Sequence, residues 1–237
     1  MDRKRQHWVI IPAAGVGRRF GGQVPKQYRS INKLTVLEHS VKPFLEDPLF
    51  KKVLIAVSPE DQYFHKLRSL ADHPKIITVV GGETRSASVL NALKALPIIA
   101  APHDWVLVHD AVRPCLLSSD ICKLIKEVGE HEFGGILSAP VADSLKQVHQ
   151  LHIVQDIDRN TVWRALTPQM FRLSLLMEGL TYCFNHKKTI TDEASAVEAI
   201  GAKPKIVAGH PNNLKITWEA DLAVAEALIL FHKGAVS

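Results

Sequence analysis

The sequence of 237 residues lacks the features that mark several large classes of protein. Its three cysteines, Cys115, Cys122 and Cys183, are widely spaced and include no Cys-x-x-Cys pair, so neither a disulfide framework nor a zinc site is expected. No apolar run approaches the ~18 residues that cross a bilayer. The basic start resembles a signal peptide only faintly. We therefore expect a cytoplasmic protein that makes no membrane contact.

Aromatic residues are also scarce, at 6% of the chain, and they form no ladder on which nucleic-acid bases could stack. The formal net charge is +5 at pH 7, but no arginine-rich tract extends beyond residues 3–5. Small anionic substrates explain such an excess of positive charge as well as a nucleic acid would. Nucleic acid is therefore not an expected partner.

Strand-like and helix-like patterns alternate along the chain. Short apolar runs rich in β-branched residues predict buried strands at 8–11, 53–57, 76–80, 105–108 and 206–208. Apolar spacing and capping residues predict helices from 35 to about 45, from 58 to about 70, through 89–96, near 120–128, from 173 to about 184, from 191 to 200 and at the end of the chain. This β-α-β pattern predicts one α/β domain over residues 1–237, with a mainly parallel, doubly wound sheet.

Three local details of this pattern can be checked against a structure. Pro43 should kink or end the first helix. Thr191 is a plausible N-cap for the helix that reaches residue 200, and free amides at that helix start could bind a phosphate. The last helix should bury one apolar side, formed by Leu222, Val224, Ala225 and Leu228.

A glycine-rich loop follows the first strand. The strand ends at Pro-Ala-Ala-Gly, residues 12–15, and Gly15 and Gly17 let a ligand come close to backbone N–H groups, which can surround an anion. The loop has neither the third glycine of the dinucleotide fingerprint nor the Gly-Lys-Ser/Thr end of a P-loop. It therefore indicates a phosphate site of another kind.

Three cations follow that loop, at Arg18, Arg19 and Lys26. A dinucleotide pyrophosphate is usually held by a helix N-terminus and backbone amides. Three cations favour a more highly charged ligand, such as a nucleoside triphosphate whose charge grows during phosphoryl transfer. The alternative is a solvated basic turn.

Two further strand ends carry polar residues at the edge where ligands bind in such sheets. Residues 81–88, Gly-Gly-Glu-Thr-Arg-Ser-Ala-Ser, combine paired glycines with hydrogen-bonding side chains at a helix start, and a simple turn with a helix cap is the alternative. Asp110 directly follows the strand at 105–108, where it can hold Mg²⁺ against triphosphate oxygens. Asp110 could instead cap the next turn or pair with Arg113.

These motifs carry a resemblance to a known family. Pro-Ala-Ala-Gly-x-Gly-Arg-Arg at 12–19, Pro-Lys-Gln-Tyr at 25–28 and His-Asp-Ala-x-Arg-Pro at 109–114 resemble the signature of the 2-C-methyl-D-erythritol 4-phosphate cytidylyltransferases of the non-mevalonate isoprenoid pathway. The resemblance extends in ordered blocks over about residues 8–231. Many members have aspartate where this chain has Glu83, so the expected sugar contact differs by one methylene group.

The resemblance implies a Rossmann-like nucleotidyltransferase fold, the substrates CTP and 2-C-methyl-D-erythritol 4-phosphate, and Mg²⁺ bound at Asp110. The catalytic residues that it implies are Arg19, Lys26, Arg159 and Lys215. The nucleotide-binding residues that it implies are Ala13, Ala14, Gly15, Gly17, Arg18, Gly82, Glu83, Ser88 and Ala111. The residues that it implies for binding the second substrate are Arg113, Thr167 and Thr191.

The regular pattern breaks after the helix near 120–128. Residues 133–148 and 151–168 are alternating or polar without clear helical spacing. A structureless loop of this length is uncommon inside a compact domain, so we expect a projecting hairpin or arm, and an arm implies a partner. The resemblance implies a β-arm at about 138–164 that interlocks the two subunits of a homodimer. It also implies that Arg159 reaches the substrate phosphate in the neighbouring active site.

The same sequence leaves three alternative functions. A cytidylyltransferase for another polyol phosphate, such as ribitol 5-phosphate, would share the nucleotide loop. A non-catalytic module that senses CTP would bind the nucleotide without releasing pyrophosphate, and it would not need Arg19, Lys26 and Asp110 together. A nicotinamide dehydrogenase is disfavoured because the dinucleotide fingerprint is missing.

Overall fold

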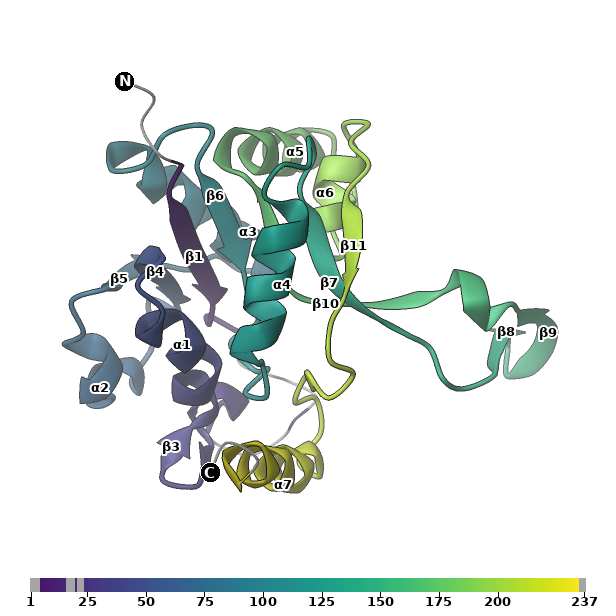
Figure 1. Cartoon of the computed structure of the whole chain (residues 1–237), viewed down its shortest axis with the longest axis horizontal. Helices are drawn as coiled ribbons and strands as arrows, with labels where there is room; N and C mark the ends of the chain where they lie inside the picture. Colours follow the sequence, from purple (N-terminus) through teal and green to yellow (C-terminus); the bar gives the residue numbers. More distant parts are fainter. Residues whose placement is uncertain (1–4, 16–19, 21–23, 235–237) are drawn as a thin grey trace.

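A seven-stranded sheet forms the centre of the computed structural model, which describes residues 5–15, 20 and 24–234 (Figure 1). Its strands lie in the order β11-β7-β10-β6-β1-β4-β5. Their bounds are β1 His7–Pro12, β4 Phe50–Val57, β5 Ile76–Val80, β6 Trp105–Val108, β7 Gly135–Pro140, β10 Trp163–Arg172 and β11 Lys205–Ala208. Within this sheet β10 runs antiparallel to its neighbours β6 and β7, and every other pair is parallel. The predicted α/β fold with a mainly parallel sheet is confirmed.

Helices cover both faces of the sheet because its central strands are apolar on both sides. In β1, Val9 and Ile11 pack with one core and Trp8 and Ile10 with the other, and all four side chains are buried. The first core includes α1 (Val36–Glu46) and α4 (Ser118–Val128). The second includes α3 (Arg85–Ala95), α5 (Leu173–Asn185) and α6 (Glu193–Glu198). The doubly wound arrangement is thus also confirmed.

The last helix, α7 (Asp221–Gly234), packs beside the small hairpin of β2 (Ser30–Ile31) and β3 (Leu34–Thr35). Its buried side chains include Ala225 and Ile229. The expectation for Val224 is wrong, because this side chain is 52% exposed. Val224 lies one residue from Ala225 and therefore about 100° around the helix from the buried stripe.

The segment between β7 and β10 leaves the body of the molecule as an arm (Figure 1). Its tip is a hairpin of β8 (Leu145–His149) and β9 (His152–Ile157), followed by the short 3₁₀ turn η4 (Arg159–Thr161). All six residues of β9 are exposed. The projecting arm is confirmed, but its base differs from the expectation. Residues 135–140 and 163–168 are strands of the central sheet rather than parts of a free hairpin.

The prediction of one helix from residue 58 to about residue 70 is wrong. A turn, the 3₁₀ turn η2 (Phe64–Lys66) and the single-turn helix α2 (Arg68–Ala71) stand there instead. The carboxylate of Asp61 accepts hydrogen bonds from the backbone N–H groups of Tyr63 (2.9 Å) and Phe64 (2.7 Å). A side chain that binds nearby backbone in this way competes with helical hydrogen bonds and ends the helix early.

Of the two effects expected of Pro43, a kink or an end of the first helix, the end does not occur, because the helix continues to Glu46. The neighbouring side chains of Val41 and Phe44 are fully buried, and Thr35 and Glu38 form the predicted capping box at the start of the helix. This packing and the cap outweigh the backbone hydrogen bond that proline lacks.

The order of the strands places a topological switch point at β1. The chain goes from β1 to β4 and β5 on one side, and it then crosses to β6 on the other side of β1. Ligands in open α/β sheets bind at the carboxyl ends of the strands at such a point. The loops after β1, β5 and β6 are those that the sequence singled out. In the described residues, no helix is long and apolar enough to cross a membrane.

Candidate active site

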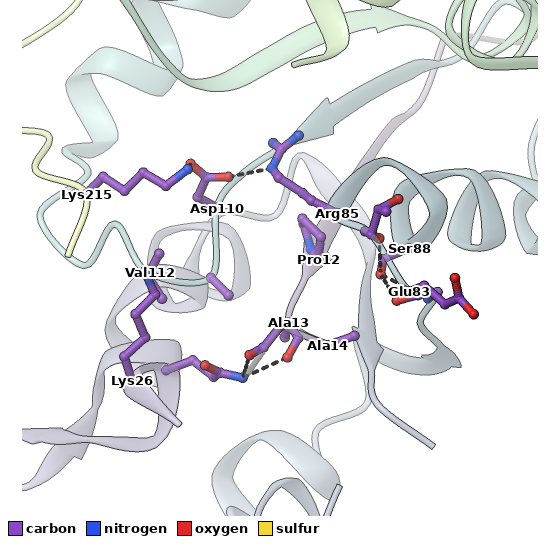
Figure 2. Close-up of a pocket in the computed structure, with 15 residues that line it drawn as sticks. Pro12, Ala13, Ala14, Lys26, Glu83, Arg85, Ser88, Asp110, Val112 and Lys215 are labelled. Carbon is purple, nitrogen blue, oxygen red and sulfur yellow. Dashed lines mark hydrogen bonds and ion pairs between the residues drawn. The ribbon is translucent and has the colours of Figure 1, made fainter. Parts of the chain in front are cut away.

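The loops after β1, β5 and β6 meet around a cavity of about 310 Å³, which we call the first cavity (Figure 2). The predicted site residues that line it are Ala13, Ala14, Gly15, Lys26, Gly82, Glu83, Ser88, Asp110, Ala111 and Lys215. They come from five separate stretches of the chain, which the fold brings to one edge of the sheet. Gly17, Arg18 and Arg19 fall outside the described residues.

The loop after β1 is held in place by a glutamine that follows Lys26. Nε2 of Gln27, on the 3₁₀ turn η1 (Lys26–Tyr28), donates to the carbonyl oxygens of Ala13 and Gly15, both at 2.9 Å. The loop carbonyls thus point toward Gln27. Lys26 lines the cavity itself, and its Nζ donates to the carbonyl oxygen of Ile216 at 2.7 Å. The first loop and the segment after β11 are therefore joined through η1.

The loop after β5 is shaped by Ser88 from inside α3. Its buried Oγ accepts from the backbone N–H of Gly82 (3.0 Å) and donates to the carbonyl oxygen of Thr84 (3.0 Å). The side chain of Thr84 caps α3. Glu83 is exposed at the rim of the cavity. The helix start predicted here is confirmed.

Asp110, directly after β6, is the charged centre of the site. Its Oδ1 accepts from Nε of Arg85 at 2.8 Å, and its Oδ2 lies 3.1 Å from Nε of Arg113 and 3.0 Å from Nζ of Lys215. Burial alone would raise the pKa of Asp110, but the charges of Arg85, Lys215 and Arg113 outweigh burial and hold that pKa well below its usual range. The carboxylate is therefore ionised at neutral pH. The alternative pairing of Asp110 with Arg113 is present, together with two further cations.

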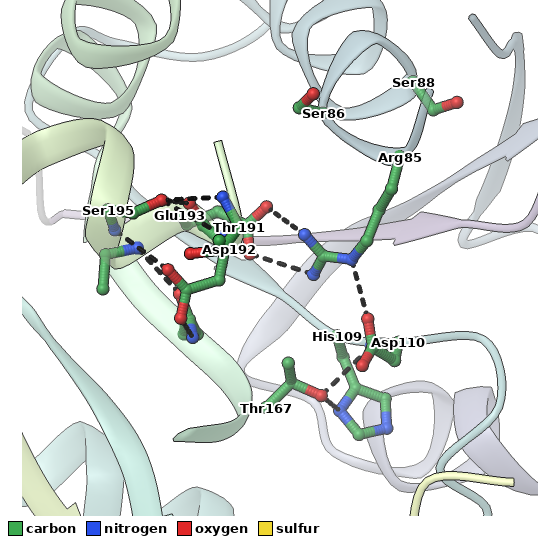
Figure 3. A network of polar contacts seen from close by, with 12 residues as sticks. Arg85, Ser86, Ser88, His109, Asp110, Thr167, Thr191, Asp192, Glu193 and Ser195 are labelled. Atoms are coloured by element: carbon green, nitrogen blue, oxygen red, sulfur yellow. Dashed lines mark hydrogen bonds and ion pairs between the residues drawn. The ribbon is translucent and has the colours of Figure 1, made fainter. Parts of the chain in front are cut away.

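A second set of hydrogen bonds fixes the backbone of Asp110. Its N–H donates to Oγ1 of Thr167 at 3.1 Å, and Thr167 Oγ1 lies 2.9 Å from Nδ1 of His109 (Figure 3). Nε2 of His109 lies 3.2 Å from the carbonyl oxygen of Arg113, which can only accept. The proton therefore belongs on Nε2, and Nδ1 accepts from the Thr167 hydroxyl. Burial lowers the pKa of His109 to about 4, so the ring is neutral at pH 7.

A second cavity, of about 260 Å³, adjoins the first. The residues predicted to bind the second substrate, Arg113, Thr167 and Thr191, line this second cavity. Arg85, Asp110 and Lys215 line both cavities and form the wall between them. The fold thus supplies two adjoining sites with one shared charged wall.

The profile of the family IspD, 2-C-methyl-D-erythritol 4-phosphate cytidylyltransferase, matches residues 7–230. The chain belongs to this family. It is a nucleotidyltransferase of the non-mevalonate isoprenoid pathway, as the sequence motifs suggested.

Relatives and solved structures agree with this membership. The 2-C-methyl-D-erythritol 4-phosphate cytidylyltransferase of Vibrio cholerae serotype O1 is 49% identical over 222 residues, covering 92% of this chain and 94% of the relative. That of Escherichia coli O1:K1 is 48% identical over 220 residues, covering 92% and 91%. A crystal structure of 4-diphosphocytidyl-2C-methyl-D-erythritol synthase superposes with a TM-score of 0.83 at 37% identity, covering 96% of this chain and 100% of that one. The enzyme of Francisella tularensis gives 0.81 at 36% identity, covering 94% and 99%.

Arg159 lies away from the two cavities of this chain. It lies on the arm in η4, where its Nη1 donates to the carbonyl oxygen of Ala142 at 2.7 Å, and it lines neither cavity. Thr191 does not cap α6, contrary to the expectation. The N-cap is Asp192, which forms a capping box with Ser195. Two amides at the start of α6 already have side-chain partners, since Ala194 N–H donates to Gln169 and Ser195 N–H to Asp192.

The donor set at Asp110 fits a magnesium ion. An ionised carboxylate offers about four lone-pair directions, and Arg85, Arg113 and Lys215 occupy three of them. Among the described residues nothing occupies the fourth direction, which suits an ion that keeps several waters and binds one carboxylate together with substrate phosphates. No group of three His, Cys, Asp or Glu side chains among the described residues forms an all-protein metal cage.

Sequence reasoning missed several residues that organise the site. Arg85 lies inside the motif at 81–88, which does not by itself indicate a function for it, and its partner Glu193 is 108 positions away in the chain. Gln27 likewise lies inside the motif at 25–28. Asn213 buries its side chain and donates from Nδ2 to the carbonyl oxygen of Thr167 at 2.7 Å. The available signal for Arg85 and Gln27 was their position inside a motif. Asn213 opens the Asn-x-Lys-x-Thr pattern at 213–217, which resembles the family's, whereas Glu193 carried no signal of its own.

Proposed function

We propose that the two cavities divide the substrates of the family's reaction, with CTP in the first and 2-C-methyl-D-erythritol 4-phosphate in the second. The reaction is cytidylyl transfer from CTP to this sugar phosphate, which forms 4-diphosphocytidyl-2-C-methyl-D-erythritol and pyrophosphate. The observation that carries the proposal is the shared wall of Arg85, Asp110 and Lys215. The α-phosphorus of CTP must lie within reach of the attacking oxygen of the sugar phosphate. The two cavities adjoin at this wall, where the two groups can meet.

On the nucleotide side, the backbone of Ala13, Ala14 and Gly15 faces the triphosphate, and the family resemblance assigns Gly17 and Arg18 to nucleotide binding as well. Among the described residues, a Cβ atom built on Gly15 would meet nothing within 4 Å, which leaves room for a ligand in front of this part of the loop. The cytosine and ribose lie against the loop after β5 and against the start of the loop after β6. The residues assigned to this contact are Gly82, Glu83, Ser88 and Ala111.

Arg19 and Lys26 stabilise the negative charge that grows on the triphosphate during transfer. Donors fixed where charge develops are commonly among the largest contributions to catalysis. Lys26 meets the geometric requirement because η1 fixes its backbone and the side chain lines the first cavity.

On the acceptor side, Arg113, Thr167, Thr191 and Lys215 hold the sugar phosphate. The phosphate is its own nucleophile: its second pKa is about 6, so it is largely ionised at neutral pH. One of its oxygens attacks the α-phosphorus of CTP and pyrophosphate leaves. The protein therefore needs no general base, and its contribution is to bring two polyanions together and stabilise their charge.

Asp110 is the residue that would hold Mg²⁺. When bound, the ion supplies charge neutralisation for the triphosphate and the leaving pyrophosphate. Because its cationic neighbours hold the pKa of Asp110 low, the carboxylate needs no deprotonation before it binds the ion.

The arm is proposed to join two copies of the chain in a homodimer. Its tip exposes apolar side chains, with Ile153 67%, Val154 59% and Leu151 98% exposed, and burying them against a second subunit is favourable. In this arrangement Arg159 enters the second cavity of the neighbouring subunit and binds the acceptor phosphate. The proposed location is the cytoplasm, because both proposed substrates are small metabolites.

The test is pyrophosphate release from CTP and Mg²⁺ in the presence of either 2-C-methyl-D-erythritol 4-phosphate or ribitol 5-phosphate. We expect release with the first sugar phosphate alone. Release with ribitol 5-phosphate alone would replace the acceptor. CTP binding without release with either sugar phosphate would contradict the enzymatic function.

A further inference from the structure

Glu193 has no place in the reaction proposed above, yet it lies beside the wall between the two cavities (Figure 3). Its side chain is fully buried at the first position of α6. Its two carboxylate oxygens accept from both Nη atoms of Arg85, at 2.7 and 3.0 Å. A buried carboxylate of this kind is costly unless it is paired, and here its partner is a residue of the active site.

The backbone that carries Glu193 is firmly fixed. Oε1 of Gln169, from β10, accepts from the N–H of Ala194 at 2.9 Å, and its Nε2 donates to Asp192 at 2.9 Å. Gln169 is itself buried. Asp192 and Ser195 close the capping box around the same turn. The carboxylate of Glu193 is therefore anchored to the central sheet on one side and to Arg85 on the other.

The other end of Arg85 meets Asp110. Nε of Arg85 donates to Oδ1 of Asp110 at 2.8 Å. A guanidinium group is planar, so a bidentate partner at the two Nη atoms also sets the direction of the Nε–H bond. The contact from Arg85 to Asp110 is thus set by Glu193, which lines neither cavity.

Replacing the carboxylate of Glu193 by an amide would leave one acceptor oxygen for the two Nη atoms of Arg85 and remove the charge that holds them. They would then be free to turn toward the remaining anions nearby, which are Asp110 and a bound phosphate. A fork contact with Asp110 would occupy the lone-pair direction that is open now. Glu193 therefore prevents Arg85 from forming a bidentate contact with the carboxylate of Asp110, which the proposed reaction needs.

We propose that Glu193 is a positioning residue for cytidylyl transfer, acting through Arg85 on Asp110. This inference rests on the function proposed above. Some residues orient a metal ligand or a catalytic group without contacting the metal or the substrate. Replacing such a residue typically changes affinity or activity by about 10–100-fold.

A double-mutant cycle tests the proposal, with Glu193→Gln, Arg85→Gln and the double variant assayed for pyrophosphate release. We expect Glu193→Gln to lower kcat by about 10–100-fold and to weaken equilibrium CTP binding, measured by calorimetry, far less. In the Arg85→Gln background the same change should alter kcat by less than about twofold, because the two residues act as one unit. Glu198→Gln, an exposed change on the same helix, is the matched control and should retain full activity.

Two results would overturn the proposal. One is a folded Glu193→Gln variant whose kcat stays within about twofold of the wild type. The other is an equal loss in both backgrounds, which is the mark of a structural contribution unrelated to Arg85. If Glu193→Gln melts below the assay temperature, Glu193→Asp replaces it in the cycle, with the same signs expected. Failure of the proposed function is distinct, because the wild type itself would then release no pyrophosphate.

Discussion

Gly81 packs against Ala14: a Cβ atom built on Gly81 would lie 2.4 Å from the Cβ of Ala14. The loop after β5 therefore touches the loop after β1 at a point where no side chain larger than hydrogen fits. The N–H of Gly81 also donates to the carbonyl oxygen of Val57 at 2.7 Å, which fixes the loop to the end of β4. This close contact fixes the spacing between the two loops on the nucleotide side.

We expect Gly81→Ala to destabilise the fold by about 1–3 kcal/mol, because an extra methyl group in a packed contact forces its neighbours apart. CTP binding should weaken as well, since the two loops would separate. Denaturant unfolding and CTP titration measure the two effects. Gly15→Ala is the matched control for stability. Its Cβ would meet none of the described residues within 4 Å, so the free energy of unfolding should change by less than about 0.5 kcal/mol.

Lys26→Ala should lower kcat by about 10²–10³-fold, the usual cost of removing a donor that stabilises transition-state charge. Steady-state pyrophosphate release measures this loss, and thermal unfolding checks that the variant is folded. Lys51→Ala, an exposed change at the start of β4, is the control and should keep wild-type activity. Near-normal turnover of Lys26→Ala would contradict the assignment.

The elements that the sequence predicted well are those whose signal is local. The buried run at 8–11 and the capping box of Thr35 and Glu38 needed no distant partner to be recognised, and both are present. The helix predicted from residue 58 failed for the opposite reason. Asp61 could have capped a long helix, but it instead holds two nearby amides and accepts from the hydroxyl of Tyr28 at 2.6 Å.

The same distinction applies to the site. Lys26 and Asp110 follow strands or stand in motifs, so their presence at one edge of the sheet could be predicted from the rule for strand ends. The pairing of Arg85 with Glu193 joins two residues that only the packing of α6 on the sheet brings together. Arg159 is the opposite case. The family resemblance pointed to it, but in the single chain it lies outside both cavities.

The stability of the protein should depend on His109 between pH 7 and pH 4. Burial lowers the pKa of His109 to about 4, while the unfolded chain has the ordinary value of 6.5. As the pH falls through this window, the unfolded chain takes up a proton that the folded protein does not. Stability therefore decreases, by about 3 kcal/mol at pH 4. Denaturant unfolding at pH 7, 5.5 and 4 should show a smaller decrease for His109→Gln, and equal slopes would contradict the prediction.

The proposed crossing of Arg159 into the neighbouring subunit can be tested by mixing two inactive variants. Arg159→Ala has an intact first cavity, and Lys26→Ala has an intact arm. A mixed dimer would contain one complete site, in which Lys26 comes from one subunit and Arg159 from the other. After subunit exchange at equal concentrations, half of the dimers are mixed and half of their sites are complete, so activity should recover to about a quarter of the wild-type value. If Arg159 acted within its own subunit, each site would lack one of the two cations and no activity would return. Variants that carry both substitutions on one chain, mixed with wild type, give the matched control for subunit exchange.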